Sequence, residues 1–291
     1  MKVAGILVIF IALAGCTGNC PTSSFSVDSN GILSVSCAPV TTSEEILFKN
    51  DIYTKTKIVL HTQTGDVVTY LAAPEHPKAA IVYIPGAGEK LTGNDDRMAT
   101  YAVAGYAFFF IDIRGNGGQT PGYPFNPQLD FSVFEKGNWP QYYLTICDIV
   151  ASQKVLSERF SVPVYAMGST NGGRYAAVGA GVDPDFAGYV GISTSDWGIL
   201  DSAIRQGYTG DPIRFAASIE PGTYFAKISP RQVWIFHSKN DPVIPFEDGE
   251  RFFNHALEPK IFIEFVGNHG INANVDDQMI IQWAQIYGTR E

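Results

Sequence analysis

The segment AMGSTNGGRYAA, residues 166–177, combines glycines and hydroxyl side chains at the spacing of a nucleophile elbow. In that motif, G-x-S-x-G, a tight strand-to-helix turn exposes a nucleophilic hydroxyl above a β-sheet. Aligning the motif with Gly168 and Gly172 places Thr170, rather than a serine, at the nucleophile position. A threonine hydroxyl can attack a carbonyl as serine does when a neighbouring base takes its proton.

Two further residues have the side chains that such a nucleophile requires. Asp241 follows the apolar run QVWIFHS, and His269 follows the apolar run KIFIEFV. A carboxylate can orient an imidazole, and the imidazole can accept the hydroxyl proton. Either residue alone is typical of a solvated loop, whereas the three together, each after an apolar run, predict a catalytic triad.

The elements predicted around these residues are strands and helices in alternation. Residues 45–62 and 66–74 show the apolar/polar alternation of antiparallel strands. The later apolar runs are short and continuous, as in buried parallel strands, and helical segments separate them. We expect residues 116–140 to form a long loop that lines a binding site, and residues 195–230 to form an irregular insert.

Five segments of the chain resemble the α/β-hydrolase superfamily: IPGAG, IDIRGNGG, MGSTNGG, HSKNDPVIP and GNHG. The resemblance extends over roughly residues 45–290. Within the superfamily, the chain resembles esterases, dienelactone hydrolases and prolyl oligopeptidases. It implies an α/β fold with a mostly parallel central sheet, helices on both faces and a short cap insert.

The resemblance also implies a role for each site residue. Thr170 would be the nucleophile, His269 its base, and Asp241 the group that orients His269. The backbone amides of Ala87 and Asn171 would form the oxyanion hole. Ser169 is the alternative nucleophile, but its side chain leaves the turn in another direction.

The threonine leaves two functions open. The first is hydrolysis of esters, or less readily of amides or peptides, through an acyl-enzyme. The second is a catalytically inactive hydrolase fold that acts as a binding or scaffold lipoprotein. The methyl of Thr170 crowds the attacking oxygen and adds strain at a turn where φ is expected to be positive. A strain of about 1–3 kcal/mol is tolerable where the surroundings hold it.

Composition and motifs exclude several partners. The chain of 291 residues has a formal net charge of −9 and a pI of about 5.0, without a Lys/Arg cluster, so nucleic acid is not an expected partner. The sequence contains no H-E-x-x-H, no paired C-x-x-C and no dinucleotide glycine fingerprint. We therefore expect neither a metal nor an organic cofactor.

The N-terminus has the features of a bacterial lipoprotein signal. Lys2 precedes an apolar run, residues 3–14, that ends in the lipobox-like tetrapeptide LAGC with Cys16. We expect a signal peptide over residues 1–15, a lipid-anchored tether over 16–44 and the hydrolase domain over 45–291. A plain secretory signal and an uncleaved anchor are the alternatives, and each places the domain outside the cytoplasm.

The sequence around the remaining cysteines indicates whether each is paired, free or buried. Cys20 and Cys37 lie in the Ser/Thr-rich tether and could pair in an oxidising compartment, or both could remain free. Cys147 falls in an apolar helical pattern, which predicts a buried core residue.

Overall fold

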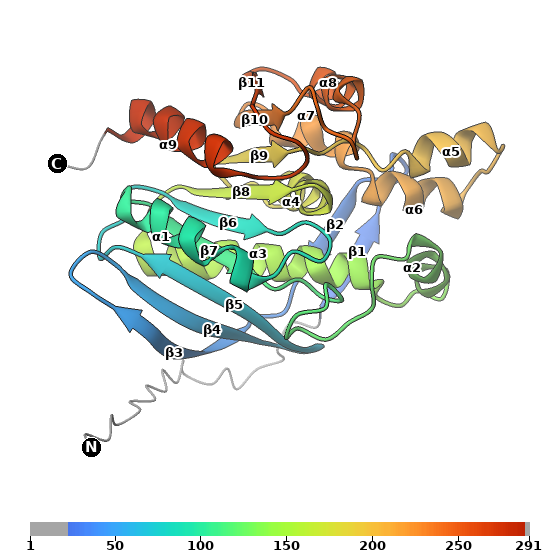
Figure 1. Ribbon diagram of the computed structural model, residues 1–291. Coiled ribbons are helices and arrows are strands. Elements are labelled where there is room, and N and C mark those ends of the chain that lie inside the picture. The colour runs from blue at the N-terminus through green and yellow to red at the C-terminus, as the bar shows by residue number, and fades with distance from the viewer. Residues whose placement is uncertain (1–22, 289–291) are drawn as a thin grey trace.

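The computed structural model describes residues 23–288, which form a nine-stranded sheet covered by helices (Figure 1). Cys16, Cys20 and the apolar run at residues 3–14 lie outside the described residues, so their assignments stay predictions. The strand order is β11-β10-β9-β8-β6-β7-β5-β4-β3. The strands are β3 (Thr41–Lys49), β4 (Thr54–Thr62), β5 (Gly65–Ala73), β6 (Ala80–Ile84), β7 (Ala107–Ile111), β8 (Val164–Ser169), β9 (Gly188–Ile192), β10 (Gln232–His237) and β11 (Lys260–Glu264).

The sheet has an antiparallel part followed by a parallel part, as the sequence predicted, but the expected strand at residues 45–62 is two strands, β3 and β4. The three from β3 to β5 pair antiparallel, and the six from β6 to β11 pair parallel with one another. β5 joins the two groups through an antiparallel pairing with β7. Because parallel strands end at the same edge of a sheet, the loops after β6, β8, β10 and β11 meet at one edge.

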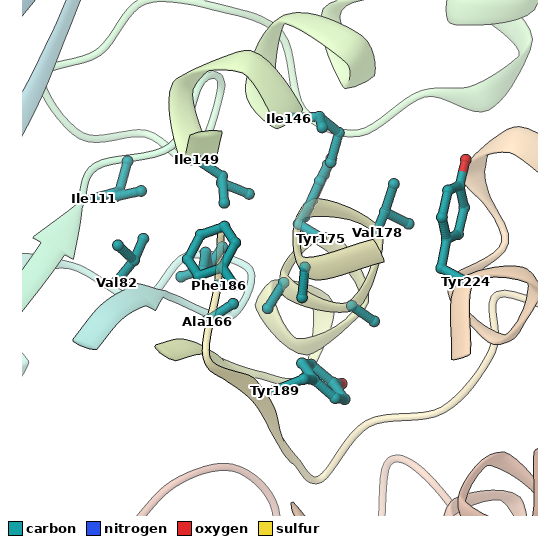
Figure 2. Close-up of a cluster of buried hydrophobic side chains, with 14 of the residues drawn as sticks. Val82, Ile111, Ile146, Ile149, Ala166, Tyr175, Val178, Phe186, Tyr189 and Tyr224 are labelled. Carbon is teal, nitrogen blue, oxygen red and sulfur yellow. The ribbon is translucent and has the colours of Figure 1, made fainter. Parts of the chain in front are cut away.

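Side chains of the parallel strands alternate between two apolar layers, one on each face of the sheet. In β6, Val82 belongs to one layer and Ile81 to the other. Helices α3 (Gln141–Phe160), α4 (Asn171–Val182) and α8 (Phe246–His255) contribute to the layer that contains Val82, which Figure 2 shows. Helices α1 (Asp95–Val103) and α9 (Ala273–Tyr287) contribute to the other. This confirms the predicted α/β fold with helices on both faces.

The segment expected to be a tether is folded from residue 24 onward. β1 (Ser24–Val27) and β2 (Leu33–Ser36) form a small antiparallel sheet, and β3 begins at Thr41. Leu33 is 1% exposed, and its amide donates to the Tyr224 hydroxyl at 3.0 Å. The tether prediction is therefore wrong for this part, because a few apolar side chains at alternate positions suffice to dock a Ser-rich segment on the domain.

The cysteine pairing also differs from the prediction. Cys37 forms a disulfide with Cys147 of α3, with an S–S distance of 2.03 Å. Pairing of Cys37 with Cys20 is thus wrong, and Cys147, expected as a buried core residue, is a partly buried disulfide partner. The reason is tertiary: the docked arm brings Cys37, just after β2, against the exposed side of α3.

The two irregular segments contain short helices. The expected loop at residues 116–140 holds α2 (Pro127–Phe134), which begins where the Asn126 side chain accepts from the Leu129 amide at 3.0 Å. The insert at residues 195–230 holds α5 (Ile199–Arg205), α6 (Asp211–Ile219) and α7 (Phe225–Ile228). Helices α2, α5 and α6 lie beyond the arrowheads of β6, β8 and β9 in Figure 1. Among residues 23–288, no helix is both long and apolar enough to cross a membrane.

Candidate active site

Thr170 occupies the turn between β8 and α4. Its backbone has φ 52° and ψ −117°, which is a strained conformation for a β-branched residue. Two contacts hold it there: the Thr170 amide donates to Ile192 O at 2.8 Å, and the Thr194 hydroxyl donates to Thr170 O at 2.9 Å. The positive φ predicted for the elbow is confirmed.

Gly168 and Gly172, on either side of Thr170, let the backbone segments approach more closely than any side chain at these positions would allow. A Cβ on Gly168 would lie 2.3 Å from the Gly172 carbonyl carbon, and a Cβ on Gly172 would lie 2.0 Å from Ile84 O. Such distances are far below contact, so α4 can pass this close to β6 and β8 only with glycine at both positions. As a result, the tight turn presents the Thr170 side chain at the edge of the sheet where the parallel strands end.

An acid and a base meet beside this turn. His269 Nδ1 lies 2.9 Å from each carboxylate oxygen of Asp241, and Asp241 is 9% exposed. Burial works to raise the pKa of Asp241, but hydrogen bonds from the Ile244 amide, from His269 and from the Val243 amide outweigh it and hold that pKa below its usual value. The carboxylate therefore stays ionised and fixes His269 with Nε2 as the nitrogen left for the cleft.

The hydroxyl of Thr170 faces the loop after β6. A Cβ placed on Gly86 would lie 2.6 Å from Thr170 Oγ1, whereas one placed on Gly270, next to His269, would lie 3.9 Å from Thr170 Cγ2. The methyl thus points to the histidine loop, and within the described residues no hydrogen bond joins Thr170 to His269. Rotation of χ1 by one staggered step would bring Oγ1 to the position that the methyl now holds and move the methyl to the position of Hβ.

The loop after β6 is held by two side chains. The Glu89 carboxylate accepts from the Gly86 amide at 2.8 Å. Asn116 accepts from the Gly88 amide at 2.7 Å and donates to the Gly86 and Glu89 carbonyls at 3.1 and 3.0 Å. The Ala87 amide between these contacts has no partner among residues 23–288, so it is available as a donor.

The second donor lies at the start of α4. Asn171 is the first residue of that helix, and no side chain caps the helix. Within the part of the chain described, its amide is unpaired, as first-turn amides are unless capped. The Asn171 and Ala87 amides are therefore both available for an oxyanion.

These groups line one open cleft of about 710 Å³. Across residues 23–288, no cluster of three or more His, Cys, Asp or Glu side chains is arranged to hold a metal ion. The cleft residues are Gly86, Ala87, Glu89, Gly93, Arg97, Ser169, Thr170, Asn171, Arg174, Val243, Ile244, His269, Gly270 and Ile271.

Three other polar residues near the strand ends have structural partners. Ser169, the alternative nucleophile, is 1% exposed, and its hydroxyl accepts from the Ile271 amide at 3.2 Å. His237 is fully buried, and its Nε2 lies 3.0 Å from Ile244 O. Arg114 binds the Asp148 carboxylate at 2.7 and 3.1 Å and so joins loops instead of facing the cleft.

Sequence reasoning missed three residues of the site: Glu89, Asn116 and Arg174. Asn116 lies in IDIRGNGG, one of the segments that carried the resemblance, so that motif was a usable signal. Glu89 follows the glycine loop without a pattern of its own. Arg174 has no pattern of its own either, because its place in the site depends on contacts with Ser195 in the loop after β9.

Comparison with known proteins identifies the fold. No protein-family model and no curated protein sequence matches the chain. Among solved structures, an acetyl xylan esterase from Paenibacillus sp. R4 has a TM-score of 0.68 and 15% identity, over 86% of this chain and 89% of that one. Acetyl xylan esterase 1 from Thermoanaerobacterium sp. JW/SL YS485 has a TM-score of 0.66 and 14% identity, over 85% and 88%. A glucuronoyl esterase from Solibacter usitatus has a TM-score of 0.59 and 11% identity, over 90% and 89%.

Proposed function

The chain has the α/β-hydrolase fold, and we propose that it is a hydrolase of carboxylic esters with a Thr170–Asp241–His269 triad. One observation carries the proposal: the Asp241–His269 pair, with Nδ1 2.9 Å from both carboxylate oxygens, opens on the same cleft as the hydroxyl at the strained turn. Buried, hydrogen-bonded acid–base pairs beside an exposed hydroxyl are the requirement for nucleophilic catalysis. Structural neighbours named as esterases agree with this reaction class.

The mechanism follows from the geometry. Thr170 Oγ1 turns toward His269 and attacks the ester carbonyl while His269 Nε2 takes its proton. The Ala87 and Asn171 amides stabilise the negative charge that develops on the carbonyl oxygen. His269 then protonates the departing alcohol, and a water activated by the same imidazole hydrolyses the acyl-threonine. Asp241 keeps the required tautomer throughout.

A binding protein without activity is the second candidate, and the orientation of Thr170 favours it. The Thr170 methyl faces the histidine loop, so the hydroxyl must rotate before His269 can act on it. Hydrogen bonds of this type are often unformed in a site without substrate. The intact acid–base pair is the reason to prefer the enzyme.

Hydrolysis across acyl lengths tests the proposal. Esters from acetate to octanoate are assayed with the full-length protein, and the control variant is Thr170→Ala. The proposal expects turnover that rises above background for short acyl groups and disappears in the variant. Equal rates for the two proteins would assign the turnover to another group.

We further propose that the protein is a membrane-anchored lipoprotein outside the cytoplasm. Lys2, the apolar run and the LAGC box support this, and the Cys37–Cys147 disulfide is of a kind that persists in oxidising compartments. In a host that processes lipoproteins, the protein should fractionate with membranes and Cys16→Ala should release it. Equal partitioning of both forms would contradict the anchor.

A further inference from the structure

Arg174 is a cation in the cleft without a carboxylate partner. Its guanidinium donates only to neutral oxygens, and no carboxylate of residues 23–288 is within ion-pair distance of it. The acceptors are Ser195 O at 2.9 Å, Ser195 Oγ at 3.0 Å, Asp196 O at 3.3 Å and Asn171 Oδ1 at 2.8 Å. A guanidinium has five N–H donors, so one, on Nη1, remains for a ligand.

The surroundings of Arg174 disfavour an isolated positive charge. Burial lowers the pKa of Arg174 below its usual value. Arg174 also lies at the N-terminal end of α4, where the helix dipole is positive and a cation is destabilised. Arg174 is only partly exposed, and a partly desolvated charge is stabilised by a counter-ion, so a bound anion would be favoured here.

The carboxylates that act on Arg174 through space have other partners. Glu220 accepts from the Trp197, Gly198 and Leu200 amides. Asp196 accepts from the Gly222 amide at 2.7 Å and lies 3.1 Å from His255. Neither carboxylate therefore neutralises the guanidinium directly.

Two other arginines show what is particular to Arg174. Arg97, in the same cleft, is neutralised by both carboxylate oxygens of Asp276 at 3.1 and 3.0 Å. Arg231 donates only to carbonyls, but these include Ala180 O at the C-terminal end of α4 and Ile228 O at the C-terminal end of α7 (Phe225–Ile228), where helix dipoles favour a cation. Only Arg174, of these three, combines the cleft, the positive helix end and the missing counter-ion.

The guanidinium is held in a fixed place. It stacks on the Trp197 ring at 4.3 Å, and Trp197 stacks on Phe125 at 4.0 Å. Thr170 is the N-cap residue of α4, Arg174 lies near the start of that helix, and both line the same cleft. An ester bound at Thr170 would thus reach Arg174 across a spacer of a few carbons.

We infer that Arg174 binds a carboxylate of the substrate, so that the preferred substrates are esters that carry a free carboxylate a few bonds from the scissile carbonyl. This rests on the proposed ester hydrolysis. The Nη1 N–H left unpaired donates to the carboxylate, and the positive end of α4 adds to the attraction. A neutral ester of the same length leaves Arg174 without its counter-ion.

Monomethyl glutarate and methyl pentanoate test this, since they differ only in a carboxylate that replaces a methyl. Methanol release gives kcat/KM for both esters with the wild type, Arg174→Gln, Arg174→Lys and the matched control Arg205→Gln. Arg205 is exposed at the end of α5, and its substitution changes the net charge equally. Thermal unfolding confirms that each variant is folded.

The wild type should favour the acidic ester at least about tenfold, and Arg174→Gln should lower that ratio about ten- to a hundredfold. Arg174→Lys should retain part of the preference and Arg205→Gln all of it. Equal rates for both esters in the wild type, or an unchanged ratio in Arg174→Gln, would overturn the inference while the hydrolase proposal survived.

Calorimetry with monomethyl glutarate separates the two proposals if neither ester is hydrolysed. Binding that the Arg174→Gln variant loses would support the carboxylate site and reject the hydrolase. Absence of binding to the wild type would overturn the inference.

Discussion

At the scale of single residues, the activity of the site depends on which staggered position the Thr170 hydroxyl occupies. The backbone of the turn is fixed by contacts with β9 and the residues after it, so χ1 is the remaining freedom. In one staggered position the hydroxyl faces Gly86, and in another it can face His269. A serine would make the same rotation without having to place a methyl in the third staggered position, so we expect it to be the faster nucleophile.

The acid and the base should differ in the cost of their removal. His269→Ala removes the proton acceptor and should abolish measurable ester turnover. Asp241→Asn leaves the imidazole but disturbs its tautomer, a change that costs on the order of 10⁴ in kcat in known triads. Steady-state kinetics on a short-chain ester measures both.

Thermal unfolding of the His269→Ala and Asp241→Asn variants serves as the control. The His269 side chain is partly exposed, so its removal should leave the midpoint of thermal unfolding nearly unchanged. A His269→Ala protein with full activity would remove this residue from the mechanism.

At the scale of elements, the loop after β6 is the part of the site that depends most on a neighbour. Asn116, which follows β7, makes three hydrogen bonds to this loop and so connects two adjacent strand ends. Its role is to position the Ala87 amide, since Asn116 does not itself line the cleft.

Asn116→Ala should therefore lower kcat about ten- to a hundredfold and change KM little. Loss of one whole oxyanion donor costs about 10²–10³, and a donor held loosely should cost less. Asn138→Ala, a substitution of an exposed asparagine, is the matched control. Wild-type kcat in Asn116→Ala would show that the loop keeps its geometry without this side chain.

The sequence predicted the elements and the site to different extents. Strands and helices from residue 45 onward followed from apolar periodicity, because the parallel strands β6 to β10 are buried on both faces and the edge strand β11 is still an apolar run. Thr170, Asp241 and His269 could be predicted together because each follows an apolar strand. Glu89 and Arg174 could not, because their roles depend on which loop packs beside them.

The N-terminal arm shows the opposite case. Its composition indicated a tether, but in the structure Leu33 docks on the domain and Cys37 is bonded to Cys147. Composition alone could not predict either contact. Both facts depend on contacts between residues distant in sequence, which local patterns cannot supply.

At the scale of the whole molecule, the Cys37–Cys147 disulfide fastens this arm to α3. The two cysteines are 110 residues apart, so the cross-link closes a long loop in the unfolded chain. A loop of about this length is worth up to about 5 kcal/mol in the chain-entropy account.

We expect the double variant Cys37→Ser, Cys147→Ser to lose about 3–5 kcal/mol in the free energy of unfolding. Urea denaturation with and without a reductant measures it. The reductant should lower the midpoint of the wild type to that of the double variant and leave the variant unchanged. A wild-type midpoint that does not respond to complete reduction would show that the disulfide does not contribute to stability.

The central claim is that the Thr170 hydroxyl is a nucleophile activated by His269, and covalent labelling tests it most directly. The protein is treated with a fluorophosphonate and digested, and mass spectrometry locates the adduct; the comparison proteins are Thr170→Ser, Thr170→Ala and His269→Ala. We predict an adduct on residue 170 of the wild type, faster labelling of Thr170→Ser, and none at this position in the other two. An adduct on Ser169, or labelling of Thr170→Ser alone, would contradict the claim, the first by moving the nucleophile and the second by showing that threonine disables the site.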